Sequence, residues 1–263
     1  NRLITDPAGL KQLYMETFIY RLRERPAKES YSELSELQES LLRKRLMISR
    51  FRKTPQWTEK DVLAVMKTLK TNKSKDPHGM INELFKLPNA GTDLIKSITV
   101  LMNRIKDQCY IPEFIRFKNV SAIYKNRGSR LDLDNDRGIM RTTILNSILQ
   151  KLIYKDIYPL IDENMTDSNV GARHGRNIRN HTFVVNSIIY DAIVKKTKPC
   201  DLAIMDYKKA FDILSPTVVN NDLRDLGIRN NKLNIFHESD KVSHIAVKTP
   251  VGITERVSCH KCV

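Results

Sequence analysis

The sequence predicts an α+β protein in which a small antiparallel sheet packs against helices and a helical extension precedes them. Long stretches show apolar residues at the three- and four-residue spacing of a helix, as in Ile98, Met102 and Ile105. A few short runs alternate between apolar and polar residues, the pattern of a half-buried strand, and the first covers 119–125. The chain shows no internal repeat and no long linker, so its 263 residues form one large or two ordinary domains.

The helices are expected before and after this first strand. Thr58, with Asp61 three positions on, forms a capping box that opens one helix. Pro26 breaks the helical stretch near the start, and Gly227 ends the last helix. The other expected helices cover 8–25, 31–52, 82–86, 92–109, 143–163, 178–195 and 216–226. The expected strands cover 119–125, 201–206, 243–248 and 253–258, and the last two pair as a hairpin.

The charge of the chain indicates a polyanionic partner. There are 45 Lys and Arg against 30 Asp and Glu, which gives a net charge of +15 and a pI near 9.7. Such an excess favours nucleic acid or an acidic membrane surface, and it makes binding depend on salt. The most apolar stretch, 183–194, is short and interrupted by polar residues, so we expect no transmembrane helix. The start lacks a signal-peptide pattern, and we expect an intracellular piece of a longer protein.

Asp206 follows four apolar residues, Leu202 to Met205, and is the first candidate for a metal ligand. A short apolar run is typical of a buried strand, and a carboxylate at its exit lies where a sheet presents side chains to a site. Oxygen atoms are the ligands that Mg²⁺ prefers, so the backbone carbonyl of Tyr207 is a second candidate. The alternative for Asp206 is the N-cap of a following helix. Phe211 is a candidate wall beneath the sugar of a nucleotide, and its alternative is a core residue in a helix.

Cations occur at two places suited to phosphate binding. Lys125 ends the first strand and Arg137 lies beyond a charged loop, so the two can close over a triphosphate. The second place is 171–179, where no acid occurs between Asp167 and Asp191 and the arginines have no partner in sequence. Its glycines allow close approach of the backbone, which favours contacts with a phosphate backbone. For each of these cations alone, the alternative is a solvated surface position.

The four cysteines are too few and too scattered for a disulfide framework. Cys259 and Cys262 have the spacing of metal ligands, but no second pair of Cys or His follows them. We therefore expect a reduced pair in preference to a zinc site.

Four motifs follow one another between residues 58 and 263. The first two are KSKDPHGM with NELFK, at 73–80 and 82–86, and IPE, IYKN and NDRGI, at 111–113, 123–126 and 135–139. The last two are NVGARHGRN at 169–177 and AIMDYKKAFD at 203–212. In this order they resemble the reverse transcriptase domain of non-LTR (LINE-type) retrotransposons and, more distantly, group II intron maturases.

The resemblance implies an RNA-directed DNA polymerase with the fingers and palm of a right hand. It assigns 1–57 to a helical N-terminal extension, 58–200 to a fingers-like region with the helices that enter the palm, and 201–263 to a partial palm. Asp206 would be the catalytic aspartate and, with Tyr207, would bind Mg²⁺ or Mn²⁺. Phe211 would select deoxynucleotides. Residues that contact the incoming triphosphate would be Lys125, Arg137 and Phe211, and those along the template–primer path Lys73, Lys75, Gly171, Arg173, Gly175 and Arg176.

The reaction of that family joins a deoxynucleotide to a primer 3′-hydroxyl on an RNA template, with two metal ions. The chain departs from the family at His78, Ala172 and Asn177, and in the polar run after Ile139. Val263 precedes the second aspartate motif and the thumb, so we expect this piece to bind nucleic acid and to polymerise little by itself. Other domains of a polyprotein and a nuclear location would follow from the same resemblance. The alternative is a degenerate or recruited copy that acts only as a nucleic-acid-binding module.

Overall fold

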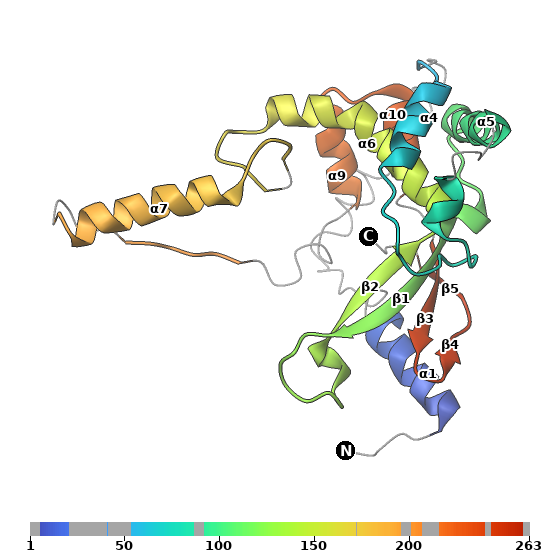
Figure 1. Cartoon of the computed structure of the whole chain (residues 1–263), viewed down its shortest axis with the longest axis horizontal. Helices are drawn as coiled ribbons and strands as arrows, with labels where there is room; N and C mark the ends of the chain where they lie inside the picture. The colour runs from blue at the N-terminus through green and yellow to red at the C-terminus, as the bar shows by residue number, and fades with distance from the viewer. Residues whose placement is uncertain are drawn as a thin grey trace.

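The structure combines a layer of helices with a five-stranded sheet (Figure 1). The computed structural model describes residues 6–20, 41, 54–86, 92–171, 173–195, 201–206, 216–239 and 243–259. Its α-helices are α1 (Pro7–Met15), α4 (Glu59–Lys67), α5 (Thr92–Gln108), α6 (Ile144–Asn164), α7 (Ile178–Ile193), α9 (Pro216–Asp225) and α10 (Asn230–Ser239). Its strands are β1 (Phe117–Tyr124), β2 (Asp136–Thr142), β3 (Ser243–Thr249), β4 (Gly252–Ile253) and β5 (Val257–Cys259). The predicted α+β class is confirmed.

The sheet is mixed, which corrects the expected antiparallel sheet. Its order is β2-β1-β3-β4, and β5 also pairs with β3. In the antiparallel hairpin β1–β2, Val120 pairs with Met140, whereas β3 runs parallel to β1 and places Val247 beside Val120. Parallel neighbours need a long crossover, and the helices between β2 and β3 provide it. Strands from the expected fingers-like range and from the expected partial palm therefore share one sheet.

Helix α1 covers one face of this sheet. Its Met15 packs with Ile19, from the π-helical turn Glu16–Tyr20, against apolar residues of β1, β3 and β5. Gly138 of β2 lies against the Phe18 ring, where a Cβ atom would come within 2.9 Å of a ring carbon. The bare backbone of this glycine lets the ring lie across β2. Residues 6–20 of the expected N-terminal extension thus contribute to the core of the sheet, whereas Trp57 belongs to the larger helical core.

Helices α4, α5, α6, α9 and α10 enclose a second and larger core, and a buried lysine holds part of this layer together. Lys106 of α5 is 1% exposed, and its ammonium group donates to the Pro55 carbonyl at 2.8 Å and to the Asp156 carboxylate at 3.0 Å. The ammonium also lies 4.1 Å from the centre of the Trp57 ring, whose N–H donates to Asp156 at 3.1 Å. The buried charge is tolerated because these contacts replace its hydration.

The carboxylate of Asp76 joins the basic loop to the start of α6. It is buried and accepts the backbone N–H groups of His78 and Met80 at 2.9 Å each, and that of Ile144 at 3.1 Å. Ile144 is the first residue of α6, where N–H groups have no partner within the helix and a negative charge is stabilised. Gly79 completes the turn with a φ of +83°, a value that favours glycine.

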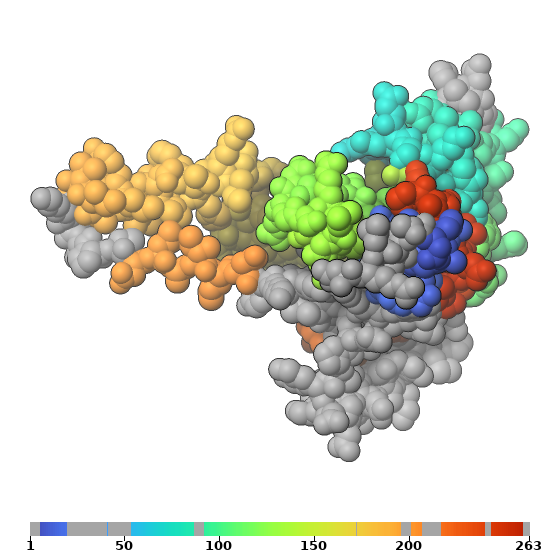
Figure 2. Space-filling view, turned by 90° about the horizontal axis from the view of Figure 1, so that it is seen from below, coloured from blue at the N-terminus to red at the C-terminus, as the bar shows by residue number. Residues whose placement is uncertain are grey.

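Some local signals lead to the elements they predict, and one does not. The Thr58 capping box is present with both of its bonds, and Gly227 follows α9 with a φ of +92°. The expected helix at 82–86 is a short 3-10 turn at Asn82–Phe85. The expected strand at 201–206 is wrong. These residues form an exposed stretch of chain that runs alongside α7 and does not join the sheet (Figures 1 and 2).

Helix α7 extends away from the other described helices (Figures 1 and 2). None of its residues is buried, and its exposed apolar side chains include Ile178, Phe183, Ile188 and Ile193. Within the described residues we find no helix that combines the length and the apolar character needed to span a bilayer.

We predict that Asp76→Ala lowers the free energy of unfolding by about 3 kcal/mol, because three backbone N–H groups, one of them buried, lose their charged acceptor. Chemical denaturation measures this change. Asp201→Ala, at an exposed carboxylate, serves as the control and should change the free energy by less than about 0.5 kcal/mol. Equal effects of the two substitutions would contradict the role given to Asp76.

Candidate nucleic-acid interface

The face of the sheet opposite α1 carries the predicted phosphate contacts. Side chains of a strand alternate between the two faces, and paired residues share a face. Ile123 of β1 pairs with Arg137 of β2 on this face. Lys125 directly follows β1, and its backbone N–H donates to the Asn135 carbonyl at 2.9 Å, which continues the ladder and assigns Lys125 to the same face. Arg137 is exposed, and Ile123 is 54% exposed. The hairpin thus brings together two cations that a charged loop separates in the sequence.

The acid next to Arg137 lies on the other side of the sheet. Asp136 belongs to the α1 face, where burial and then the charge of Asp136 raise the pKa of Tyr14. Arg137 therefore presents its charge away from this carboxylate. The ammonium group of Lys125 donates to the carbonyl of Asp134 at 2.9 Å, which holds the lysine at the base of the loop.

A third cation connects the hairpin with the basic loop. Arg141 pairs with Asn119 on the face opposite α1, and its guanidinium donates to the carbonyl of Lys75 at 3.2 Å. Lys73 and Lys75 are exposed in the loop that Asp76 anchors to α6. Arg141 therefore attaches the basic loop to the strand that also carries Arg137, although the two predicted groups of cations lie more than 45 residues apart in sequence. We name Lys73, Lys75, Lys125, Arg137 and Arg141 the hairpin face.

Sequence reasoning missed Arg141 and an aromatic group beside the basic loop. Arg256 lies 4.3 Å from the centre of the Phe117 ring and donates to the Pro77 carbonyl at 3.3 Å. The ring of His78 also packs on Phe117, with centroids 5.3 Å apart. Continuing the two-residue period of β2 past Arg137 would have found Arg141. Arg256 has no such signal, because its position depends on the pairing of β3 with β1 and β5.

The arginines of the segment after α6 are held by internal ion pairs. The Arg173 side chain is 7% exposed, and its guanidinium donates to the Asp162 carboxylate at 2.8 Å and to the Thr166 carbonyl at 2.9 Å. Arg176 bonds Asp167 at 2.6 Å. The expectation that these arginines lack acidic partners is wrong, because the acids precede them, at the end of α6 and in the turn that follows.

The two arginines differ in what they leave at the surface. Arg176, Gly171 and Gly175 are exposed, and Gly175 has a φ of +72°. The N–H donors of Arg173 point inward. The hydrogen bond that Arg173 donates to the Asp162 carboxylate is the main cause of the lowered pKa of that carboxyl group. Arg173 thus stabilises the turn, while the exposed residues are the part of the predicted template path that a ligand can reach.

Asp206 lies at the end of exposed extended chain. Ile204 and Met205, which precede it, are 85% and 87% exposed, and Asp206 itself is exposed. The apolar run meets no sheet among the described residues, so its pattern alone does not produce a strand. Tyr207 and Phe211 lie outside the described residues, and their predicted roles stay predictions.

Asp206 is the one predicted metal ligand within the described residues, and the structure does not place it in a cluster of metal-binding side chains. The Asp206 carboxylate suits a hard cation such as Mg²⁺. Across the described ranges, however, no group of three or more His, Cys, Asp or Glu side chains is placed to hold an ion. One carboxylate does not hold two ions, so we derive no catalytic step through a metal.

The expectation that Cys259 is reduced is wrong, because this buried cysteine is disulfide-bonded.

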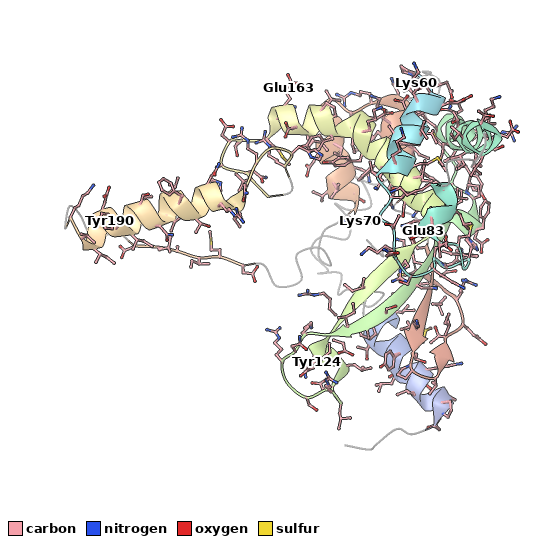
Figure 3. All side chains as sticks on the ribbon, in the orientation of Figure 1. Lys60, Lys70, Glu83, Tyr124, Glu163 and Tyr190 are labelled. Carbon is pink, nitrogen blue, oxygen red and sulfur yellow. The ribbon has the colours of Figure 1, made fainter. Side chains whose placement is uncertain are left out.

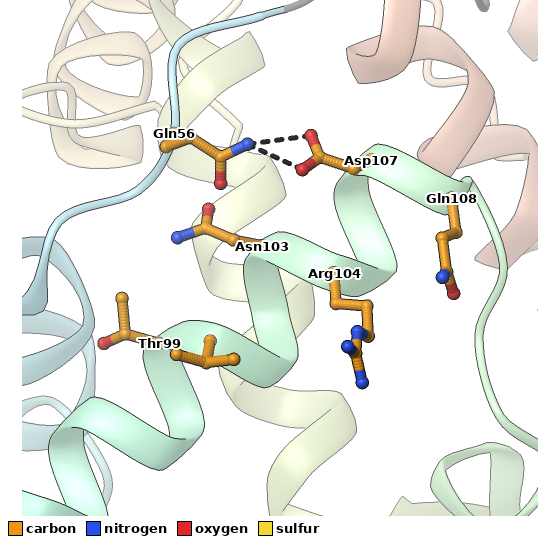
Figure 4. A pocket seen from close by; sticks show the side chains of 7 residues that line it. Gln56, Thr99, Asn103, Arg104, Asp107 and Gln108 are labelled. Atoms are coloured by element: carbon orange, nitrogen blue, oxygen red, sulfur yellow. Dashed lines mark hydrogen bonds between the residues drawn. The ribbon is translucent and has the colours of Figure 1, made fainter.

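A hollow of about 450 Å³ lies on the outer side of α5, apart from the predicted site residues (Figure 4). Gln56 donates there to both carboxylate oxygens of Asp107 at 2.8 Å, and the side chain of Asn103 bonds the backbone of Trp57. These bonds attach the segment before α4 to α5. The hollow therefore reflects a structural junction and contains no residue of the candidate interface.

The chain matches no protein-family model and no curated protein. The reverse-transcriptase resemblance therefore rests on the four motifs.

We predict that Arg173→Ala lowers the melting temperature by several degrees, because the turn after α6 loses its internal ion pair and carbonyl contacts. Arg176→Ala removes the same charge at an exposed ion pair, which contributes little to stability. A thermal melt followed by circular dichroism compares the two variants. A larger loss in the Arg176 variant would contradict the assignment.

Proposed function

We propose that the chain is the fingers and first palm motif of an RNA-directed DNA polymerase of the non-LTR retroelement type. The observation that supports this most strongly is the placement of Lys125 and Arg137 on one exposed sheet face. The resemblance assigns these two residues to the incoming triphosphate. Their shared face is what that role requires, since a triphosphate needs several cations within its own length.

The basic loop extends this surface toward a nucleic-acid strand. Arg141 holds the loop of Lys73 and Lys75 beside the hairpin, so cations on two chain segments can reach neighbouring phosphates. Binding would release counterions and would weaken steeply as salt increases. The partners we propose are an RNA template, a DNA primer and deoxynucleotide triphosphates.

The proposal assigns the metal ligand to Asp206 and, through its backbone carbonyl, to Tyr207. Bound Mg²⁺ or Mn²⁺ would supply charge stabilisation for phosphoryl transfer. The residues of the hairpin face act independently of the ion: they neutralise and orient the phosphates. Phe211 is proposed to contact the sugar.

A second candidate is a nucleic-acid-binding module without polymerase activity. The exposed position of Asp206, on chain that joins no sheet, favours this reading. Both candidates require the hairpin face to bind phosphates, and they differ only in what Asp206 does.

We predict that Arg137→Gln weakens binding of a fluorescent deoxynucleotide triphosphate about tenfold, the effect of losing a charge-assisted hydrogen bond. Lys125→Gln should act in the same direction. Lys60→Gln removes the same charge on α4, far from Tyr124 of the hairpin (Figure 3), and should alter affinity less than about twofold. Equal losses of affinity in all three variants would mean that these residues act only through the net charge of the protein. The support for a triphosphate site would then be lost.

We predict that Asp206→Ala abolishes primer extension in the complete protein while leaving its affinity for primer–template unchanged, because the carboxylate serves the reaction and not the binding. In the same protein, Phe211→Val should increase ribonucleotide incorporation. Extension on an RNA template with each sugar type measures both effects. Activity that survives Asp206→Ala would exclude the polymerase role of this residue and leave the binding module as the better candidate.

A further inference from the structure

A stripe of cations and aromatic rings follows the solvent side of α6, beyond the hairpin face. Lys151, Tyr154, Lys155 and Tyr158 are spaced three and four residues apart, so they line one side of the helix. The opposite side of α6 is buried in the larger core through residues such as Leu149, Leu152 and Ile153. The stripe therefore lies at the edge of this packing, where Lys151 and Lys155 bond residues of α4 and its C-cap.

One end of the stripe gathers three lysines from three chain segments. The ammonium group of Lys151 donates to the hydroxyl of Thr68 at 2.6 Å, and that of Lys86 donates to the carbonyl of Leu69 at 2.7 Å. Both lysines therefore reach the C-terminal end of α4, next to Lys70. Burial, with the charges of Lys70 and Lys86, lowers the pKa of Lys151. The three like charges repel one another, and a bound phosphate would relieve that repulsion.

Two acids border these lysines, and neither neutralises all three. Glu83 accepts the backbone N–H of Asn72 at 2.5 Å, which is the main cause of its lowered pKa, and the charge of Lys86 contributes to the same shift. Asp61 is paired with Lys155, whose hydrogen bond is the largest cause of an Asp61 pKa of about 2. Lys155 is thus committed to Asp61, and we leave it out of the phosphate contacts.

The other end of the stripe is a cluster of three aromatic rings. Tyr154 and Tyr158 lie 4.8 Å apart at an angle of 32°, and the His174 ring meets Tyr158 edge-on at 5.0 Å. The Tyr158 hydroxyl donates to Asp162 at 3.0 Å and accepts the backbone N–H of His174 at 2.9 Å. Tyr158 is therefore fixed from both sides, while Tyr154, which the His174 ring also meets edge-on at 6.3 Å, remains 43% exposed.

We propose that this stripe binds single-stranded nucleic acid, with phosphates at Lys70, Lys86 and Lys151 and a base stacked on Tyr154. Cations that follow a backbone beside an exposed ring are the combination that recognises single strands, because every base has a face that can stack. In a duplex those faces are covered by neighbouring bases. The inference rests on the proposed binding of nucleic acid and adds the strand type and the site.

The test is fluorescence anisotropy with an oligodeoxythymidylate and with a duplex of equal length. Tyr154→Ala should weaken single-strand binding about tenfold, or about 1.4 kcal/mol, and duplex binding less than about twofold. Tyr154→Phe keeps the ring and should restore affinity. Tyr190→Ala, at an exposed tyrosine far along α7 (Figure 3), is the matched control and should leave single-strand affinity unchanged.

The lysines are tested through the salt dependence. Lys70→Gln should reduce the slope of log affinity against log salt by about 0.7 for the single strand, the value for one phosphate contact. Lys60→Gln, at the other end of α4, should leave the slope unchanged. An unchanged slope in the Lys70 variant would exclude this residue from the proposed phosphate contacts.

A measurement on the unaltered chain covers the case in which Tyr154→Ala disturbs folding. An oligonucleotide with 5-iododeoxyuridine forms photo-crosslinks with a ring on which it stacks, and mass spectrometry should locate them at Tyr154. Crosslinks confined to other residues would overturn the proposal.

The outcomes separate this inference from the proposed function. If the chain binds triphosphates through the hairpin face but Tyr154→Ala leaves single-strand binding intact, the stripe is wrong and the proposed function stands. If Tyr154→Ala weakens single strand and duplex equally, the stripe does not select strands and the inference fails. If the unaltered chain binds neither nucleic acid nor triphosphate, both proposals fall.

Discussion

The three backbone hydrogen bonds accepted by the Asp76 carboxylate are the constraint on which the arrangement of the cations depends. Two of them close the turn that ends the basic loop, and the third caps α6 at Ile144. Because β2 ends directly before α6, this one buried carboxylate sets the loop, the hairpin and the helix in register. Lys75 then lies within reach of Arg141, and the stripe on α6 begins two turns further along the same helix.

The mixed sheet explains why the hairpin face is available for a ligand. Helix α1 packs on the other face and buries Val120, Ile245 and Val247 with it. The face that α1 leaves open carries Arg137 and Arg141, whereas Asp136, the acid next to Arg137 in β2, belongs to the α1 face. One sheet thus separates an apolar side that stabilises the fold from a basic side that suits phosphates. The separation follows from the two-residue period of a strand.

The large net charge of the chain does not by itself locate a binding surface. Lys106 is buried against Asp156 and Trp57. Arg173 forms an internal ion pair with Asp162 in the turn after α6, and Lys155 is paired with Asp61. Charge that serves folding is enclosed by partners at hydrogen-bonding distance. The cations of the hairpin face differ, as do Lys70, Lys86 and Lys151, because each group gathers like charges from chain segments that are distant in sequence. Repulsion between like charges in each group destabilises the free protein, and a bound phosphate backbone would neutralise these charges and relieve the repulsion.

Sequence by itself determined the helices at 92–109, 143–163 and 178–195, the strand at 119–125 and the cap at Thr58, because spacing and capping act within a few residues. It also located Lys125 and Arg137, whose shared face follows from one hairpin. Only the tertiary structure decided that β3 runs parallel to β1, that Arg173 turns inward to Asp162, and that Leu202 to Asp206 stay outside the sheet. The physical reason is that strand direction, ion-pair partners and burial depend on residues brought together from far along the chain.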